Sequence, residues 1–197
     1  MKILKKQPVA VLVALVIMAL ALVYGVNRSV GEQVSYVKDQ FYNGVFDAHA
    51  GFRRAGIHGQ LTQRTTAAMR MLAIGDFSHP DEPELQSAGD ELQAARDDMI
   101  ALLTEGATPS RLFVADQELT ITANRYFMLL HPLVVAAEGE DLEALETAEN
   151  TMQSAARVIA ESGYNEAVGV FNRTVMGAFP MTVLRVIVFV QMPELFA

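Results

Sequence analysis

Histidines and carboxylates are the side chains whose spacing could support metal or acid–base chemistry in this chain. His49 and His58 are nine residues apart, which places them on opposite sides of a straight helix. No Glu-x-x-His or His-Glu-x-x-His motif accompanies them or the other two histidines, His79 and His131. Asp76 and His79 fall in "GDFSHPDEP", where a solvated turn is a better interpretation than a divalent-ion site. We therefore expect no metal and no cofactor.

Nucleophilic and phosphate-binding motifs are also missing from the sequence. It contains no Gly-x-Ser-x-Gly and no phosphate-binding loop, and it has no cysteine. The carboxylates of "EGEDLEALETAE", residues 138–149, are typical of the acidic N-terminal end of a helix, which the helix dipole favours. We expect a protein that is not an enzyme and has no catalytic residues.

One strongly apolar segment, residues 9–26, must be placed before any site can be. It holds 18 uncharged residues, and at about 1.5 Å per residue this is just enough to cross a bilayer core of about 30 Å. A buried core helix and a cleavable signal peptide, with Ala19-Leu20-Ala21 as the cleavage site, are the alternatives. The run is longer than the usual signal-peptide core, so we predict a retained signal-anchor.

The charge distribution predicts which side of the membrane the rest of the chain occupies. Lys2, Lys5 and Lys6 precede the apolar run, and this excess of positive charge favours a cytoplasmic N-terminus in the inner membrane, with the body on the periplasmic side. All 23 acidic residues follow the run. A body this acidic does not suit nucleic acid, whose phosphates require the opposite sign.

The rest of the chain has the apolar spacing of helices, and no strand competes before residue 182. Residues 28–74 are predicted to be one helix with a kink within "HAGFRRAGIHG", residues 49–59. A second helix begins near Glu82, a third at Pro109 and a fourth runs from Asp141 to Ala178. Short turns between them predict an up-down-up-down arrangement. The predicted buried seam of the second helix is Leu85, Ala88, Leu92, Ala95, Met99 and Leu102.

Arginine residues are concentrated in one part of the body. From Ala48 to Gly75 there is no acidic residue, whereas Arg53, Arg54, Arg64 and Arg70 all lie there. Pairing with the acidic second and fourth helices is one interpretation. A docking patch for an acidic partner is the other.

The C-terminal part, "AARVIAESGYNEAVGVFNRTVMGAFP" (155–180) and "VLRVIVFVQMPELF" (183–196), resembles the last helix and the tail of the LemA family. The layout is similar too, with one N-terminal span, a long-helix bundle and a short tail. The matching positions are Ala155, Ala156, Arg157, Tyr164, Asn165, Ala167, Val168, Phe171, Asn172, Phe179, Pro180, Phe189, Pro193 and Phe196. The resemblance implies a membrane-anchored helical bundle without an established enzymatic activity. The chain departs from the family at residues 46–61, which lack the usual Pro and Asn.

The stretch around Tyr164 is predicted to receive the C-terminal tail. Tyr164 and Phe171 are seven residues apart, as are Asn165 and Asn172, so each pair lies on one helical face. The tail segment "MTVLRVIVFV", residues 181–190, is too short to cross a membrane and prone to aggregate if exposed, so it needs a surface. Either it folds back onto this face, with the Phe179-Pro180 step as the hinge, or it docks onto another protein.

These observations predict an all-α protein in which an N-terminal transmembrane helix precedes an elongated antiparallel four-helix bundle with a short apolar C-terminal tail. The predicted divisions are 1–8, 9–26, 27–180 and 181–197. The expected function is that of a scaffold or accessory subunit that binds other envelope proteins or a second copy of itself. The alternative is a small-ligand sensor or carrier that uses a cavity between helices. The candidate interaction residues are Tyr164, Asn165, Phe171, Asn172, Phe179, Pro180, Phe189, Phe196, Arg53, Arg54, Arg64 and Arg70.

Overall fold

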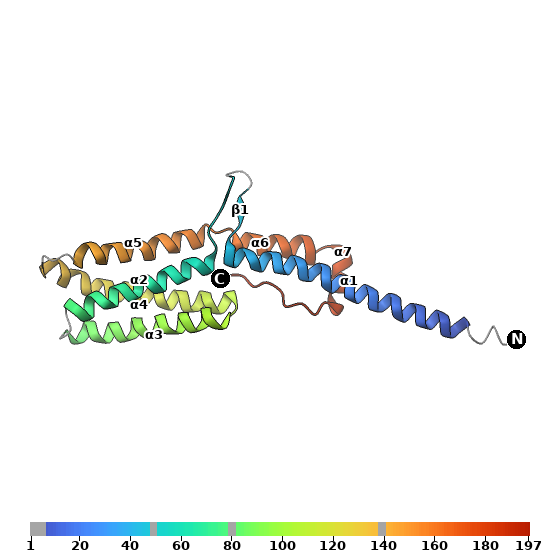
Figure 1. Ribbon diagram of the computed structural model, residues 1–197, viewed down its shortest axis with the longest axis horizontal. Coiled ribbons are helices and arrows are strands. Elements are labelled where there is room, and N and C mark those ends of the chain that lie inside the picture. Colours follow the sequence, from blue (N-terminus) through green and yellow to red (C-terminus); the bar gives the residue numbers. More distant parts are fainter. Residues whose placement is uncertain (1–6, 48–50, 79–81, 138–140) are drawn as a thin grey trace. The chain divides into compact units, whose positions relative to one another are not determined.

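A computed structural model describes residues 7–47, 51–78, 82–137 and 141–197 of the chain. The described residues are almost wholly helical, as the sequence predicts. They fall into two compact units (Figure 1). Unit 1 consists of residues 1–38 and 166–193, and unit 2 of residues 39–165 and 194–197.

The first helix, α1, runs from Gln7 to Asn43 and contains the apolar run. An 18-residue window of α1 has a mean hydropathy of 2.5 and none of it is buried. By length and composition this helix could cross a membrane, although a signal sequence passes the same test. After the run, Val30, Val34 and Val37 are buried at three- and four-residue steps, as expected for one packed helical face.

The prediction of one kinked helix over residues 28–74 is wrong, because the helix breaks completely. Strands β1 (Phe46–Asp47) and β2 (Phe52–Arg53) pair antiparallel between α1 and α2, and Figure 1 shows them standing away from the helices of unit 2. Gly44 directly follows α1, at the point where the chain turns toward β1, and has a φ of 82°. A Cβ at this position would lie 1.7 Å from the Arg54 carbonyl oxygen, so only glycine fits there.

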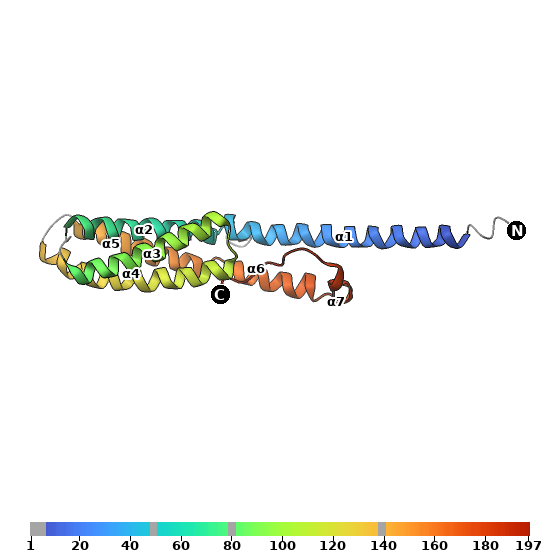
Figure 2. The same cartoon turned by 90° about the horizontal axis from the view of Figure 1, so that it is seen from below.

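Four helices make up most of unit 2, and Figures 1 and 2 show how they are arranged. They are α2 (Ile57–Ser78), α3 (Pro83–Glu105), α4 (Pro109–Ala137) and α5 (Asp141–Ala160). Helix α2 packs extensively against α5 and α3, and α3 packs extensively against α4. The starts of α3, α4 and α5 agree with the predicted starts near Glu82, at Pro109 and at Asp141.

The predicted seam of α3 is confirmed, since all six of its residues are buried. In α4 the apolar spacing predicts a seam of Leu112, Leu119, Ala123, Tyr126, Leu130 and Leu133. The first five are buried, but Leu133 is only partly buried and Val134 takes its place. The shift follows Pro132, which lies inside the helix and cannot donate a backbone hydrogen bond.

The prediction of one fourth helix from 141 to 178 is also wrong. Helix α5 ends at Ala160, and α6 runs only from Tyr164 to Phe171. Gly163 separates them with a φ of 76°, a conformation that terminates a helix. A π-helical turn, Asn172–Met176, then precedes α7 (Phe179–Leu184) and a 3₁₀ turn, Arg185–Ile187. Pro180 therefore lies at the start of a short helix.

Candidate interaction sites

The end of the tail is bound within unit 2 by Tyr164 and Asn165, at the start of α6. The Asn165 side-chain amide donates to the Phe196 carbonyl oxygen at 2.9 Å, and its oxygen accepts from the Phe196 backbone N–H at 2.8 Å. The Tyr164 hydroxyl donates to the Glu194 carbonyl oxygen at 2.8 Å. The last residues of the chain therefore bind at this face, whereas the predicted segment, residues 181–190, bonds α1 through Ile187 and Phe189.

An aromatic cluster in unit 2 accompanies these hydrogen bonds. The Phe196 ring centroid lies 5.3 Å from that of Phe113 and 6.1 Å from that of Phe41, and Phe41 lies 5.3 Å from Tyr164. Phe41, Tyr164 and Phe196 are buried. Such edge-to-face and tilted contacts at these separations are favourable beyond the area they bury.

Burial changes the acidity of the tyrosine that holds the tail. It raises the pKa of Tyr164 to about 12, with smaller contributions from Glu194 and Tyr42. The phenol therefore stays protonated at neutral pH and can donate to the tail carbonyl.

A second asparagine, which the sequence interpretation missed, holds the tail within unit 1. The Asn27 amide donates to the Ile187 carbonyl oxygen at 2.7 Å, and its oxygen accepts from the Phe189 backbone N–H at 2.7 Å. Asn27 is the first polar residue after the apolar run, and that position was the signal that could have identified it.

The other residues predicted around the tail take different positions. Phe171 is buried, as expected for the helix seam, whereas Asn172 is exposed and begins the π-helical turn. Asn172 therefore does not repeat the role of Asn165, because the α-helical geometry needed for the seven-residue repeat ends between them. Phe179 and Pro180 begin α7, and the Phe189 side chain is exposed.

The four arginines of the acid-free window do not form one patch. Arg53 lies 3.7 Å from the Asp39 carboxylate and donates to the Gly44 carbonyl oxygen, and Arg54 donates to the Glu161 carbonyl oxygen at 3.0 Å. Arg64 is buried and pairs with Asp116 of α4 at 2.8 Å. The prediction that Arg64 contacts a partner is therefore wrong, because its side chain is buried inside unit 2 and pairs with Asp116.

Desolvation is the largest influence on the protonation of both members of the buried pair. Burial lowers the pKa of Arg64 and raises the pKa of the Asp116 carboxyl, and the attraction between the two charges only partly opposes both shifts. Arg64 also donates to the Thr120 hydroxyl. Among the described residues, Arg64 Nε and Asp116 Oδ1 have no hydrogen-bond partner. Such a pair is weak evidence for stability.

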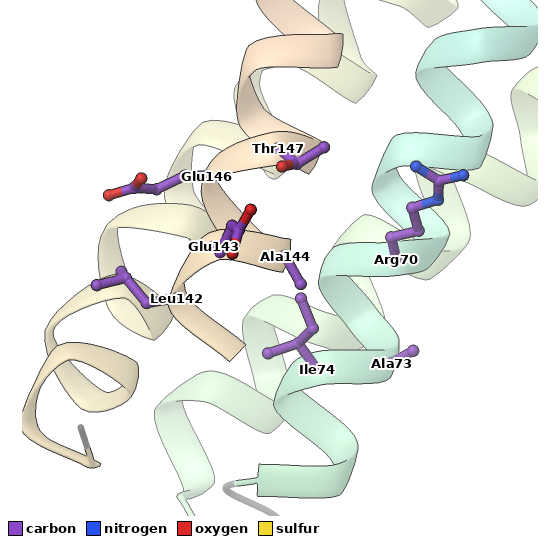
Figure 3. A pocket seen from close by; sticks show the side chains of 8 residues that line it. All are labelled: Arg70, Ala73, Ile74, Leu142, Glu143, Ala144, Glu146 and Thr147. Atoms are coloured by element: carbon purple, nitrogen blue, oxygen red, sulfur yellow. The ribbon is translucent and has the colours of Figure 1, made fainter. Parts of the chain in front are cut away.

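Arg70 lies in an open groove between α2 and α5, with a volume of about 950 Å³ (Figure 3). Within the described parts of the chain, its guanidinium forms no hydrogen bond or ion pair. Figure 3 shows Arg70 on one wall and Glu143, Glu146 and Thr147 on the other. Of the two glutamates, Glu146 points away from Arg70, so the groove brings the Arg70 guanidinium and the Glu143 carboxylate to apolar side chains that include Ile74.

A search of the described residues finds no group of three or more His, Asp or Glu side chains placed to hold a metal ion. Comparison with known proteins finds no matching family model, no matching curated protein and no matching solved structure.

Proposed function

We propose that this chain is a non-enzymatic, membrane-anchored helical protein of the cell envelope, acting as a scaffold or accessory subunit that binds other envelope proteins. The LemA family is the affiliation we propose, on the resemblance of residues 155–196. We further propose that α2 to α5 form an antiparallel four-helix bundle. Their mutual packing and short connections support this arrangement.

The exposed apolar part of α1 supports the membrane anchor. A core helix would be mostly buried, whereas none of the apolar window is buried here. Leaving so much apolar surface in water is unfavourable, so the helix requires lipid or another apolar environment.

Two experiments on the full chain test the anchor and its orientation. N-terminal sequencing of the purified protein should begin at residue 1 or 2, whereas a start at Leu22 would show that the segment is a cleaved signal peptide. Alkaline phosphatase fused after Ala197 should be active if the body lies in the periplasm. An inactive phosphatase together with a fluorescent GFP fusion would reverse the proposed topology.

The single observation that carries partner binding is an apolar stripe on α4. Val114, Ile121, Met128 and Val135 repeat every seven residues and are 68%, 61%, 76% and 45% exposed. Exposed large apolar side chains also occur on α2 and α3, at Met69, Phe77 and Ile100, but without such a repeat. A row of exposed apolar side chains along one helix gives the apolar face of an amphipathic helix a surface on which to pack.

Charged residues border the apolar stripe along one edge and uncharged polar residues along the other. This favours a partner helix whose apolar face has charged residues along only one of its edges. Arg111, Glu118 and Arg125 follow one edge at the same spacing, and Gln117 and Asn124 follow the other. Ile121 and Met128 also line a groove of about 810 Å³ beside α3, where an apolar side chain of the partner could insert. We propose as partner a helix of another envelope protein with an apolar residue every seven positions.

A photo-crosslinking amino acid at position 121 tests this surface in cells. The matched control is the same amino acid at position 69, because Met69 is exposed and apolar but lies off the stripe. Mass spectrometry should identify an envelope protein crosslinked at position 121 and not at 69, with the contact mapped to an amphipathic helix. Identical products at both positions, or crosslinks only to a second copy of this chain, would contradict the proposal.

The groove around Arg70 supports the alternative of a small-ligand sensor or carrier. A ligand with both charge signs would match the Arg70 guanidinium and the Glu143 carboxylate. Size and composition separate the two functions: a scaffold solubilised in detergent should co-purify in a larger assembly, whereas a carrier should run alone. Native mass spectrometry should then detect a bound small molecule that the Arg70→Ala variant lacks.

A further inference from the structure

The C-terminal tail is bonded to α1 at the point where the apolar run ends. Asn27 immediately follows Val26, the last residue of the run, and it bonds the backbone of Ile187 and Phe189. These contacts lie within unit 1. They therefore place tail residues 187–189 at the level of α1 where the anchor emerges from a bilayer.

The direction of the tail along α1 follows from a second contact. Gly31 lies one turn beyond Asn27, and a Cβ on Gly31 would be 3.8 Å from Val190 Cγ2. From Ile187 to Val190 the chain thus runs along α1 in the direction away from the apolar run. The residues before Ile187 therefore lie beside Asn27 or beside the apolar run. Figure 2 agrees, since α7 lies beside the middle of α1.

The side chains of this segment suit a membrane boundary. Val183, Val186 and Phe189 recur every three residues and are 66%, 84% and 79% exposed. Arg185, between them, is exposed as well. On α1, the exposed Tyr24 lies three residues before Asn27, and aromatic residues are enriched where a span meets the headgroups.

We propose that residues 183–189 form a second, peripheral contact with the lipid bilayer. Asn27 binds the tail backbone and leaves Val183, Val186 and Phe189 to enter the boundary between headgroups and acyl chains, while Arg185 reaches the lipid phosphates. Lipid then covers the apolar face that would otherwise make this tail prone to aggregate. This inference rests on the proposed membrane anchor, because it takes the level of the bilayer from α1.

Fluorescence quenching of single-cysteine variants tests the proposal, and the chain is convenient for this because it has no cysteine. The full chain is reconstituted in phosphatidylcholine vesicles with and without phosphatidylglycerol, and a polarity-sensitive fluorophore is attached to Val186→Cys. Nitroxide lipids with a shallow spin label should quench it strongly, and iodide in water should quench it weakly. The matched control is Tyr36→Cys, which is 62% exposed, lies nine residues beyond Asn27 on α1, and should respond to iodide and not to the lipid label.

A third label, at Leu20→Cys, separates failure of this inference from failure of the anchor. If lipid labels quench Leu20 but not Val186, the tail contact is wrong and the anchor stands. If they quench neither position, the proposed anchor fails and the tail inference fails with it. Protection of Val186 from both quenchers would mean that protein covers the segment, which also overturns the lipid contact.

Two further variants connect the contact to the residues that produce it. Asn27→Ala should release the tail and reduce lipid quenching at Val186, while Asn172→Ala should leave it unchanged. Arg185→Gln should remove the additional quenching that phosphatidylglycerol produces. Quenching that is indifferent to both Asn27→Ala and Arg185→Gln would overturn the proposed geometry.

Discussion

At the scale of single residues, asparagine side chains supply the backbone partners that an extended tail lacks. A carboxamide has both a donor and an acceptor, so one side chain can satisfy a backbone N–H and a backbone C=O at once. Asn165 does this with both groups of Phe196, and Asn27 with Phe189 and Ile187. Neither pair of contacts requires a neighbouring strand.

The first prediction concerns the donor of Asn165. Asn165→Asp keeps the acceptor for the Phe196 N–H but places a carboxylate against the Phe196 carbonyl oxygen. We expect the free energy of unfolding to fall by about 1–2 kcal/mol, the scale of one lost hydrogen bond. Urea unfolding in detergent measures it, and Asn172→Asp, at an exposed position, is the control. Equal stability of the two variants would show that the tail contact is not stabilising.

The second prediction concerns the buried pair of Arg64 and Asp116. Asp116→Ala should lower the free energy of unfolding by about 3–5 kcal/mol, because it leaves a buried guanidinium without its counter-ion. The double variant Arg64→Met, Asp116→Leu should recover most of this loss, since apolar side chains avoid the cost of desolvating both charges. Denaturant unfolding of all three proteins checks this. A double variant less stable than Asp116→Ala would mean that the pair is stabilising in itself.

The third prediction follows from the acidity of Tyr164, whose pKa is raised to about 12 against an ordinary value of 10. Between these values the unfolded chain loses the phenolic proton while the folded chain keeps it, so stability falls as the pH rises. This contribution is fully present below pH 10 and amounts to about 2–3 kcal/mol. Tyr126, whose pKa burial also raises to about 12, adds a similar loss.

Unfolding curves recorded from pH 9 to 12 measure this effect. Tyr164→Phe should remove the part of the decrease in unfolding free energy that comes from Tyr164, and Tyr126→Phe should remove the part that comes from Tyr126. A curve for Tyr164→Phe with the same slope as the wild type would place the Tyr164 phenol in water.

At the scale of elements, two glycines that look alike in the sequence have opposite roles. Gly163 separates α5 from α6 with a positive φ, whereas Gly169 lies inside α6, where an added Cβ would meet only Arg173 Nη1 at an ordinary 3.5 Å. The fourth prediction is that Gly163→Ala destabilises the protein by about 1–2 kcal/mol. Gly169→Ala, the matched control, should stabilise it by up to about 1 kcal/mol. Thermal unfolding gives both signs, and a stabilising Gly163→Ala would mean that α5 and α6 can join.

Sequence patterns predict these helices well where apolar residues keep the helical repeat. They predict poorly where the φ of one residue decides whether the helix ends. The α3 seam is fully predicted, since six apolar residues repeat at helical spacing between clear end signals. The two missed breaks each contain a glycine with positive φ, Gly44 and Gly163, and a glycine in the sequence does not reveal its φ. The two-residue strands β1 and β2 are too short to show an alternating pattern.

The candidate site was predictable to a similar degree. The seven-residue spacings of Tyr164 with Phe171 and of Asn165 with Asn172 indicate a face that receives other residues, and Tyr164 and Asn165 hold the end of the tail. The partner of Arg64 was not predictable, because Asp116 is one of 23 acidic residues and only packing selects it. Its position singles out Asn27, but the role of Asn27 is not predictable, because one polar residue after an apolar run does not reveal which backbone it will bond.

At the scale of the whole molecule, the chain passes twice through each unit. It runs from unit 1 to unit 2 after Lys38, returns to unit 1 at Glu166 and enters unit 2 again at Glu194. Residues 166–193 belong to unit 1, and Glu194 to Ala197 belong to unit 2. Each unit thus holds the tail by its own asparagine, Asn27 in unit 1 and Asn165 in unit 2. The two attachments can therefore be tested separately.

The last prediction is that the final four residues stabilise unit 2 specifically. Truncation after Pro193 removes the Phe196 ring from Phe41 and Phe113 and the tail carbonyl from the Tyr164 hydroxyl. Emptying a buried phenylalanine site costs about 3–5 kcal/mol, so the melting temperature should fall, and an apolar dye should bind the uncovered rings. Amide hydrogen exchange should accelerate in α2 to α5 while the protection of α1 around Val30 and Val34 persists. Phe196→Ala in the full chain should reproduce most of the change, since it keeps the backbone that Asn165 binds. An unchanged melting temperature with loss of a co-purified protein would instead show that the chain end serves a partner.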